Sequence, residues 1–484
     1  MVQGHVKGES ILVARRDDQY FAIGASCTHY GAPLATGIMV DDTVRCPWHH
    51  ACFSLRTGEA LRAPALDPVT CWKVETRAGQ LFVHNKEPEK KPRAAGSAKM
   101  PENVLIVGGG AAGNAAAEML RREGYRGDLT VISADDSIPY DRPTLSKDFL
   151  NGSASEKMIP LRSKNFYQKH AIELLLKTRV AAIDTHNKAV QFADGKERKF
   201  DALLLATGAE PMKLKVPGAD LAHVCYLRTR SDCRMIIAKA GKAKRIVLVG
   251  ASFIAMEVAS ALIQRKVEVH IVAPEEIPMA RVLGPEVGAH LRRLHERNGA
   301  VFHLHQGVIA VDEHKVTLKD GQTVSAELVV IGIGVKPVID LAEHAGIKTD
   351  RGVSVNEYLE TNIPGIFAAG DIARWPDPVT GDNIRVEHWV VAERQGQTVA
   401  RNILGQRERF DAVPFFWTSQ FDFTLNYIGH AEEWDKLELE GSIEDHDCKL
   451  SFQRAGKTLA VATVGRDRQS LESEVAMERS SRRF

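Results

Sequence analysis

Two short loops near the start of the chain each hold one cysteine and one histidine. Cys27 and His29 form the first pair, and Cys46 and His49 form the second. A [2Fe–2S] cluster can take this mixture, because two cysteine thiolates hold one iron and two histidine imidazoles hold the other. Zinc takes the same ligand types, but a zinc finger usually places two cysteines in one knuckle and two histidines on a helix. Cysteine and histidine alternate here, and this order favours iron.

The residues around these ligands support an iron–sulfur site. The segments Cys27–Leu34 and Cys46–Phe53 resemble the two cluster-binding loops of Rieske ferredoxins and Rieske oxygenases. His50 departs from that pattern, because most members have glycine there, and glycine tolerates backbone conformations that histidine disfavours. We expect a slightly reshaped loop with a solvated surface imidazole at His50. The alternative is a proton-exchanging group beside the cluster.

Length and composition predict several globular domains and few kinds of partner. The chain has 484 residues, of which 44% are hydrophobic and 26% are charged, as is usual for globular proteins. Its 63 basic residues balance 62 acidic residues, so no strong field attracts nucleic acid or an anionic membrane surface. No apolar run reaches the roughly eighteen residues of a membrane span, and the N-terminus lacks the pattern of a secretory signal.

The remaining cysteines show no disulfide framework, which fits a reducing, cytoplasmic environment. These five residues are Cys52, Cys71, Cys225, Cys233 and Cys448.

Hydrophobic patterns divide the chain into four parts joined by one linker. Residues 1–86 contain short strands and turns, which predict an all-β module, and the charged, proline-containing stretch 87–101 predicts a linker. Two later segments, Val104–Gly108 and Ile246–Gly250, each combine an apolar strand with a glycine turn and a helix, which predicts two doubly wound α/β domains. The expected domains are 102–216 with 339–408, then 217–338, and a small C-terminal α/β domain at 409–484, whose basic end from residue 478 we expect to be a solvated tail.

The first strand–turn–helix unit carries a dinucleotide fingerprint. Gly108, Gly110 and Gly113 form the pattern G-x-G-x-x-G, which allows a tight turn, close approach of a pyrophosphate and close helix–strand packing. The N-terminus of the following helix offers N–H donors to the phosphates. The next strand leads to Asp135 and Asp136, and its register favours Asp135 as the ligand of the ribose hydroxyls.

From Pro139 to Lys147 the chain resembles the oxygenase-coupled ferredoxin reductases and the apoptosis-inducing-factor-like flavoproteins. The resemblance implies that Arg142 meets the pyrophosphate of FAD, while Pro143 and Lys147 lie against its isoalloxazine. Two further segments resemble other FAD motifs of that family. They add Thr207, Gly208, Gly370 and Asp371 to the expected FAD-binding residues.

The second fingerprint is altered. Gly250 follows its strand as expected, but Ser252 and Ala255 replace the second and third glycines, at some steric cost. The Rieske-bearing branch of the apoptosis-inducing-factor-like family resembles this version, so we expect NAD(P)H here, with an unoccupied fold as the alternative. The acidic residue that usually closes the next strand is missing at Ala273, and Glu275 is the nearest candidate to bind the ribose diol, which favours NADH over NADPH.

The resemblance also implies roles for single residues around the two cofactors. Glu257 lies near the nicotinamide, and with Lys147 it shapes the pocket in which NAD(P)H reduces FAD. Gly334 belongs to the loop that passes the nicotinamide, and Trp389 and Trp417 stand where the family keeps residues near flavin or nicotinamide; plain core positions are the alternative for both tryptophans.

The cysteine positions restrict the route of the electrons. No cysteine lies between Cys71 and Cys225, so a thiol cannot take electrons from the flavin as in disulfide reductases, unless Cys225 or Cys233 moves in. The iron–sulfur cluster is then the expected one-electron acceptor.

We therefore predict an NAD(P)H:acceptor oxidoreductase resembling the ferredoxin reductases over essentially the whole chain. Electrons pass from NADH through FAD and the [2Fe–2S] cluster to an external acceptor such as an oxygenase or a cytochrome. Two alternatives stay open: a self-contained NADH oxidase or quinone reductase, and an interaction protein whose redox centres are structural. The sequence leaves the terminal acceptor and the oligomeric state open.

Overall fold

The N-terminal module consists of two antiparallel sheets. In the computed structural model, which describes residues 1–88 and 100–481, alternating side chains bury Leu12, Ile23 and Phe53 between these sheets. The predicted all-β module is confirmed, whereas most of the predicted linker lies outside the described residues. One sheet has the order β1-β2-β3-β8-β9, formed by Val2–Val6, Glu9–Arg16, Gln19–Gly24, Cys71–Arg77 and Gln80–Lys86. The other has the order β4-β5-β6-β7, formed by Ile38–Val40, Thr43–Arg45, Cys52–Ser54 and Ala60–Arg62.

The first doubly wound domain contains a five-stranded parallel sheet. Its strands are apolar along their length because helices and loops cover both faces. The order is β12-β11-β10-β16-β28, from Glu173–Leu175, Asp128–Ile132, Asn103–Val107, Ala202–Leu205 and Ile366–Ala368. Strand β28 follows the second domain in sequence, so the chain returns to the first domain to complete this sheet. Helices α1 (Ala111–Arg122) and α9 (Trp389–Ile403) pack against each other beside it.

The second doubly wound domain repeats this design. Its parallel sheet has the order β18-β25-β19-β20-β21, from Val224–Tyr226, Leu328–Ile331, Arg245–Val249, Glu268–Val272 and Val301–His303. The main helices are α4 (Arg230–Ala240), α5 (Phe253–Gln264) and α7 (Pro285–Arg297). The other short helices and strands of the two domains lie outside the two parallel sheets: α2 (Asp148–Asn151), α3 (Lys164–Lys169), α6 (Ala280–Leu283), α8 (Asp340–His344), β13–β15 (180–199), β22–β24 (308–325), β17 with β26 (209–211, 335–337), and β27, β29 and β30 (353–384).

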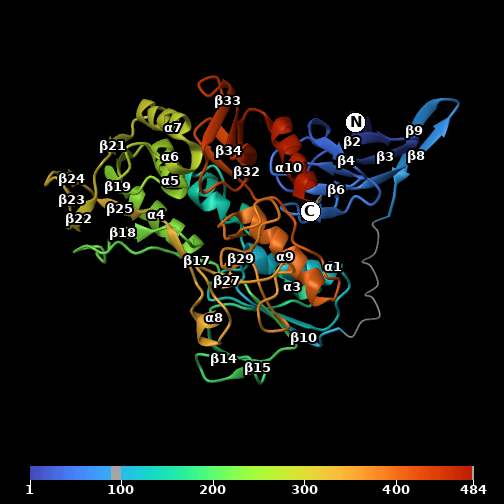
Figure 1. Cartoon of the computed structure of the whole chain (residues 1–484), viewed down its shortest axis with the longest axis horizontal. Coiled ribbons are helices and arrows are strands. Elements are labelled where there is room, and N and C mark those ends of the chain that lie inside the picture. The colour runs from blue at the N-terminus through green and yellow to red at the C-terminus, as the bar shows by residue number, and fades with distance from the viewer. Residues whose placement is uncertain (89–99, 482–484) are drawn as a thin grey trace.

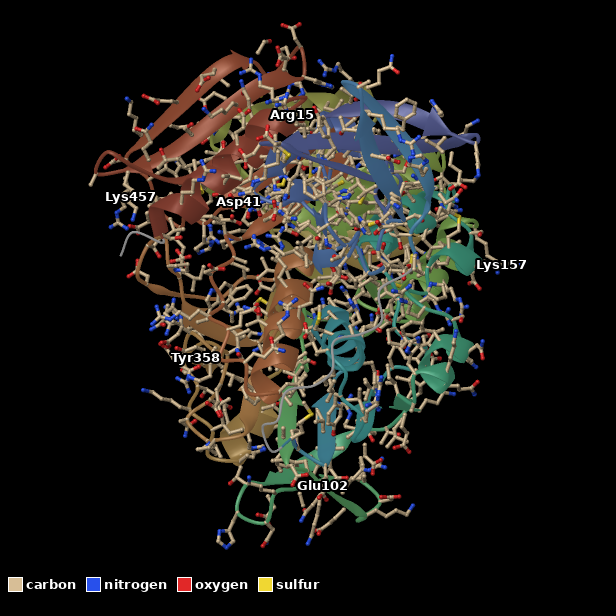
Figure 2. All side chains as sticks on the ribbon, turned by 90° about the vertical axis from the view of Figure 1, so that its right-hand side faces the viewer. Arg15, Asp41, Glu102, Lys157, Tyr358 and Lys457 are labelled. Carbon is tan, nitrogen blue, oxygen red and sulfur yellow. The ribbon has the colours of Figure 1, made fainter. Side chains whose placement is uncertain are left out.

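The C-terminal domain is an antiparallel sheet with one long helix, which agrees with the predicted small α/β domain. The sheet order is β31-β32-β35-β34-β33, from Phe415–Gln420, Phe423–Gly429, Lys457–Val464, Asp447–Arg454 and Lys436–Ser442, and helix α10 spans Asp467–Ser481. Figure 1 shows α10 between this sheet and the strands of the N-terminal module. In Figure 2 the labelled residues Arg15 and Asp41 of that module lie at the end of the molecule that holds the C-terminal sheet, and Glu102 lies at the opposite end.

No helix within residues 1–88 and 100–481 combines the length and the apolar character that a bilayer crossing requires.

We expect the contact between α1 and α9 to depend on Gly396. A Cβ atom added there would lie 2.2 Å from the carbonyl oxygen of Ala112, and a backbone carbonyl cannot move aside as a side chain can. Overpacking of this kind costs about 1–3 kcal/mol, sometimes more. Gly396→Ala should therefore lower the melting temperature by several degrees, although alanine favours helix formation. Gly307, which has open space around its Cβ position, provides the control variant Gly307→Ala, and equal melting temperatures of the two variants would contradict the expectation.

Candidate redox site

The four expected cluster ligands come from two loops with the same backbone pattern. In the first loop the Cys27 N–H donates to the carbonyl of Ala32 (2.8 Å), and the Gly31 N–H donates back to the carbonyl of Cys27 (2.9 Å). In the second loop the Cys46 N–H donates to Ala51 (2.8 Å), and the His50 N–H donates to Cys46 (3.2 Å). Gly31 and His50 therefore occupy equivalent positions, and both have left-handed backbone conformations, with φ of 81° and 60°.

The ligand side chains converge in two pairs. The Cys46 thiol hydrogen-bonds to Cys27 and lowers the pKa of Cys27, so the two sulfur atoms lie together. The rings of His29 and His49 have centroids 5.0 Å apart. Burial lowers the pKa of His29 to about 4 and the pKa of His49 well below its usual value, so both imidazoles are neutral, as ligation requires. Two cysteines on one side and two neutral histidines on the other fit the two irons of a [2Fe–2S] cluster. By contrast, no three donors in the described part of the chain are placed to hold a single metal ion.

The first glycine turn has the shape that a dinucleotide requires. Gly108 has φ of 119°, and a Cβ atom there would lie 2.0 Å from the carbonyl of Ala206; at Gly113 it would lie 1.9 Å from the carbonyl of Gly108. The Arg142 guanidinium lies 3.1 Å from the Cβ position of Gly110 and forms no ion pair among the described residues. A cation above an open glycine turn at the start of α1 fits a bound pyrophosphate.

The other expected FAD residues lie around this turn. The Asp135 carboxylate accepts a hydrogen bond from the Tyr140 hydroxyl (2.7 Å), so a ribose would have to share it. Thr207 donates to the carbonyl of Val338 (2.6 Å), and Gly208 has φ of 72° beside the ion pair of Asp371 with Arg228 (2.9 Å). The Gly370 N–H donates a hydrogen bond to the side-chain oxygen of Gln395 on α9 (2.7 Å). Pro143, the remaining FAD candidate, begins the turn that ends at Lys147.

Lys147 and Glu257, the two expected catalytic residues, form a buried ion pair. The Lys147 ammonium lies 2.7 Å from a carboxylate oxygen of Glu257 on α5. The same carboxylate accepts hydrogen bonds from the hydroxyls of Ser146 (2.6 Å) and Thr418 (2.8 Å). One carboxylate thus joins the FAD motif, the second doubly wound domain and the C-terminal sheet.

Trp417 connects this pair with a cluster ligand. Its ring centroid is 4.3 Å from that of His49, and the Lys147 ammonium lies 5.9 Å from the same indole ring. Trp389 is the first residue of α9 and is half-buried beside Glu393, to which it hydrogen-bonds; burial raises the pKa of Glu393 well above its usual value. Trp417 thus contacts a cluster ligand of the N-terminal module, whereas Trp389 contacts Glu393 on its own helix.

The altered second fingerprint is compensated within the fold. Gly250 keeps φ of 107°, and a Cβ atom there would lie 2.4 Å from the carbonyl of Gly332, whose oxygen accepts a hydrogen bond from Ser252 (2.9 Å). A Cβ atom on Gly332 would in turn lie 2.8 Å from the Cβ of Ala255. The glycine missing from the helix is thus replaced by one in the facing loop. Glu275 follows β20 on the exposed surface, and Gly334 follows β25 with φ of 106°.

Cys225 and Cys233, the two thiols that could have moved toward the flavin, are buried in this fold. No disulfide bond joins cysteines in the described part of the chain. The Cys233 thiol donates to the carbonyl of Leu145 (3.2 Å), and burial raises the pKa of Cys233 to about 12. Burial also raises the pKa of Cys225. Both thiols stay protonated, and only a thiolate reacts as a nucleophile.

Two expectations for charged residues are wrong. His50 is fully buried instead of solvated, because its side chain packs into the C-terminal domain. Glu478 is also buried, paired with Arg45 (2.6 Å), so residues 478–481 of the predicted solvated tail are the last part of α10, while residues 482–484 lie outside the described residues. The sequence analysis also missed the hydrogen bond that the Tyr30 hydroxyl donates to Asp141. Tyr30 stacks on His29 with ring centroids 3.9 Å apart. Its position next to the expected ligand His29 was the one feature of the sequence that could have indicated a role for Tyr30.

Three family models match the chain. Residues 1–73 match the Rieske [2Fe-2S] domain, residues 102–396 match the pyridine nucleotide-disulphide oxidoreductase model, and residues 415–482 match the reductase C-terminal model. The chain belongs to the pyridine nucleotide-disulphide oxidoreductase family. This membership and the Rieske domain identify its cofactors as FAD, NAD(P)H and a [2Fe–2S] cluster.

Relatives of this oxidoreductase include proteins with and without the N-terminal module. Apoptosis-inducing factor 3 from Homo sapiens is 33% identical and aligns with 94% of this chain and 78% of its own. Putidaredoxin reductase CamA from Pseudomonas putida is 32% identical over 75% of this chain and 89% of its own. Among solved structures, the covalent putidaredoxin reductase–putidaredoxin complex superimposes with a TM-score of 0.76 at 31% identity, covering 79% of this oxidoreductase and 94% of that chain.

Asp141 should make the stability of the oxidoreductase depend on pH. Burial raises the pKa of Asp141 to about 6, from a usual value of 3.8. Between these values the folded protein keeps a proton that the unfolded chain has released, so this carboxyl lowers stability as the pH rises through that window. Asp141→Asn should therefore match the parent near pH 4 and exceed it at pH 7, by up to about 3 kcal/mol. Melting temperatures of both proteins between pH 4 and 8 test this expectation.

The exposed neighbour Asp136, whose pKa is lowered by the Ser137 hydroxyl, provides the control Asp136→Asn. A difference between Asp141→Asn and the parent that stays constant, or shrinks with rising pH, would contradict the assignment.

Proposed function

We propose that this oxidoreductase takes electrons from NADH and delivers them, through FAD and its own Rieske cluster, to an external one-electron acceptor protein. The proposal depends on one observation: Glu257, Lys147, Trp417 and His49 form a continuous series of contacts from α5 to a cluster ligand. A series that crosses all four parts of the chain suits internal electron transfer. Sheet membership supports the proposed domain division, with residues 102–216 and 339–408 in one domain and 217–338 in another.

The residues of this series bind and orient, while the cofactors supply the chemistry. A bound FAD would supply hydride acceptance from the nicotinamide and one-electron transfer toward the cluster. Glu257 is fixed by three donors, so it holds the Lys147 ammonium at one place beside Trp417. The Trp417 indole packs against the ring of His49. The glycine turn at Gly108–Gly113 and the Arg142 guanidinium would hold the FAD pyrophosphate.

Several finer points belong to the same proposal. A Rieske oxygenase or a cytochrome is the kind of acceptor that we favour, and nucleic acid is not expected because the net charge is +1. The described cysteines form no disulfide bond, which supports a reducing compartment such as the cytoplasm. Steady-state assays with cytochrome c, quinones and oxygen separate this proposal from a self-contained oxidase, which would need no protein acceptor.

The order of reduction tests the proposed path. After anaerobic mixing with NADH, flavin absorbance should bleach before the electron paramagnetic signal of the reduced cluster appears. Trp417→Phe should slow the second step and leave the first unchanged, because the contact with His49 is weakened while the ion pair of Lys147 with Glu257 stays. Trp434→Phe, in the same domain and away from His49, is the matched control. Each preparation should contain about two iron atoms per chain.

A cluster that stays oxidised while the flavin turns over would contradict the proposed function. Purified protein that contains zinc and no iron would also contradict it. Equal rates of cluster reduction in the parent and in Trp417→Phe would remove Trp417 from the path and leave the overall function intact.

The donor preference should depend on Glu275. This exposed carboxylate follows β20, where the adenosine ribose of a nicotinamide cofactor binds in doubly wound domains. Glu275→Ala should raise the KM for NADH about tenfold, because hydrogen bonds to a charged group are lost, and should change the KM for NADPH less. Glu276→Ala is the matched control, since Glu276 is an exposed neighbour. An unchanged KM for NADH in Glu275→Ala would exclude this role.

A further inference from the structure

A network of buried charged residues joins the Rieske module to the rest of the protein. None of its members belongs to the electron path described above. We call it the interface charge network; it consists of Arg45, His50 and Arg62 from the Rieske module, Arg394 from α9, and Glu474 and Glu478 from α10.

Glu474 is the centre of this network. One of its carboxylate oxygens accepts from Arg394 (2.8 Å), and the other accepts from His50 (3.0 Å) and Arg45 (3.1 Å). The Glu474 side chain is fully buried. Burial alone would raise the pKa of Glu474, but the cationic partners outweigh it and hold this pKa well below the usual range. Glu474 is therefore ionised, and Arg45 and His50 would each lose a buried acceptor if the module moved away.

Glu478 repeats this arrangement one turn further along α10. It lies 2.6 Å from a guanidinium nitrogen of Arg45 and 2.5 Å from one of Arg62. Arg45 thus bridges both glutamates from the strand that precedes the second cluster loop. A buried ion pair of this kind is strongly destabilised when one partner is removed, because the other charge stays buried without compensation.

His50 is the member that the cluster loop contributes directly. Its position matches that of Gly31 in the first loop, and both residues are left-handed, a conformation that costs free energy for histidine but not for glycine. Its imidazole contacts three residues of the C-terminal domain: Glu474, the hydroxyl of Ser470 (3.0 Å) and the ring of Phe415, whose centroid is 4.2 Å away. The histidine is therefore unfavourable for the loop itself and is stabilised by contacts outside the module.

Other contacts hold the Rieske module from further directions. The Ala63 N–H donates to the side chain of Gln397 on α9 (3.0 Å), and Arg122 on α1 donates to the carbonyl of Ala60 (2.8 Å). Ile38 packs against Leu471 and Val475 on α10. Contacts on α1, α9 and α10 fix both position and rotation of the module.

We propose that His50, with Glu474 and Arg394, is a positioning residue that docks the Rieske module in a single pose on the reductase and so keeps His49 against Trp417. The carbonyl of His50 also accepts a hydrogen bond from Arg394 (3.0 Å), so the backbone and the side chain of the residue next to ligand His49 are both held. On this view the cluster does not swing between the flavin and an outside partner. The inference rests on the proposed function for its role in electron transfer, but the docked pose is tested separately.

The variant His50→Gly tests the proposal without strain on the cluster loop. Glycine accepts the left-handed conformation, as Gly31 does in the other loop, so iron content and the spectrum of the reduced cluster should stay as in the parent. Hydrogen exchange of the full-length, cofactor-loaded protein should become at least about tenfold faster in residues 46–51 and 470–478, because charge-assisted hydrogen bonds are lost. Reduction of the cluster by the flavin should slow, while reduction of the flavin by NADH is unchanged.

Glu474→Gln should give the same changes, and Glu472→Gln is its matched control, because Glu472 lies exposed on the same helix and pairs with Arg468. Unchanged exchange in both His50→Gly and Glu474→Gln would overturn the proposal, whatever the electron-transfer rates. If exchange is faster in the variants but the cluster of the parent protein is never reduced, the docked pose is supported and the proposed function is contradicted.

Discussion

The Glu257 carboxylate is the interaction on which the arrangement of the whole electron path depends. It accepts from Ser146 and Lys147 of the FAD motif and from Thr418 of the C-terminal sheet, while it is itself carried by α5 of the second doubly wound domain. Thr418 follows Trp417, so the carboxylate also fixes the strand that presents the indole to His49. A buried carboxylate is costly unless it is paired and hydrogen-bonded. Its three donors satisfy that requirement only when three separate parts of the chain stand in one arrangement.

The same principle operates at the Rieske module. Apolar packing gives the Rieske module its own core, but arginine, glutamate and histidine form buried contacts between the module and the reductase. Buried ion pairs contribute little net stability compared with apolar residues of similar size. Buried ion pairs do, however, restrict the relative position of their partners, because a buried charge that loses its partner costs free energy. Electron transfer requires a fixed distance between the redox centres. Charged contacts fix that distance better than an apolar interface, whose surfaces can shift relative to each other.

The sequence predicted those features whose physical cause is local. The cluster ligands, the turn at Gly108 and the pair of doubly wound domains follow from spacing and hydrophobic period within short segments. The burial of His50 did not, because it depends on Ser470, which is 420 residues away in the chain. Ala255 shows the same limit. From the sequence it weakens the second fingerprint, but in the structure Gly332, in another loop, leaves the space that its side chain needs. Family resemblance named Lys147 and Glu257, but only the fold shows that they form an ion pair of 2.7 Å.

The covalent union of one Rieske module with one reductase also sets a stoichiometry. Hydride brings two electrons, whereas a [2Fe–2S] centre carries a single one. Each chain has one cluster for one flavin, and α10 holds the module that carries this cluster in place. The cluster must therefore be reoxidised twice for every molecule of NADH that is oxidised. A recipient protein must therefore return to the same surface, or two recipients must take turns there, before the next nicotinamide can be used.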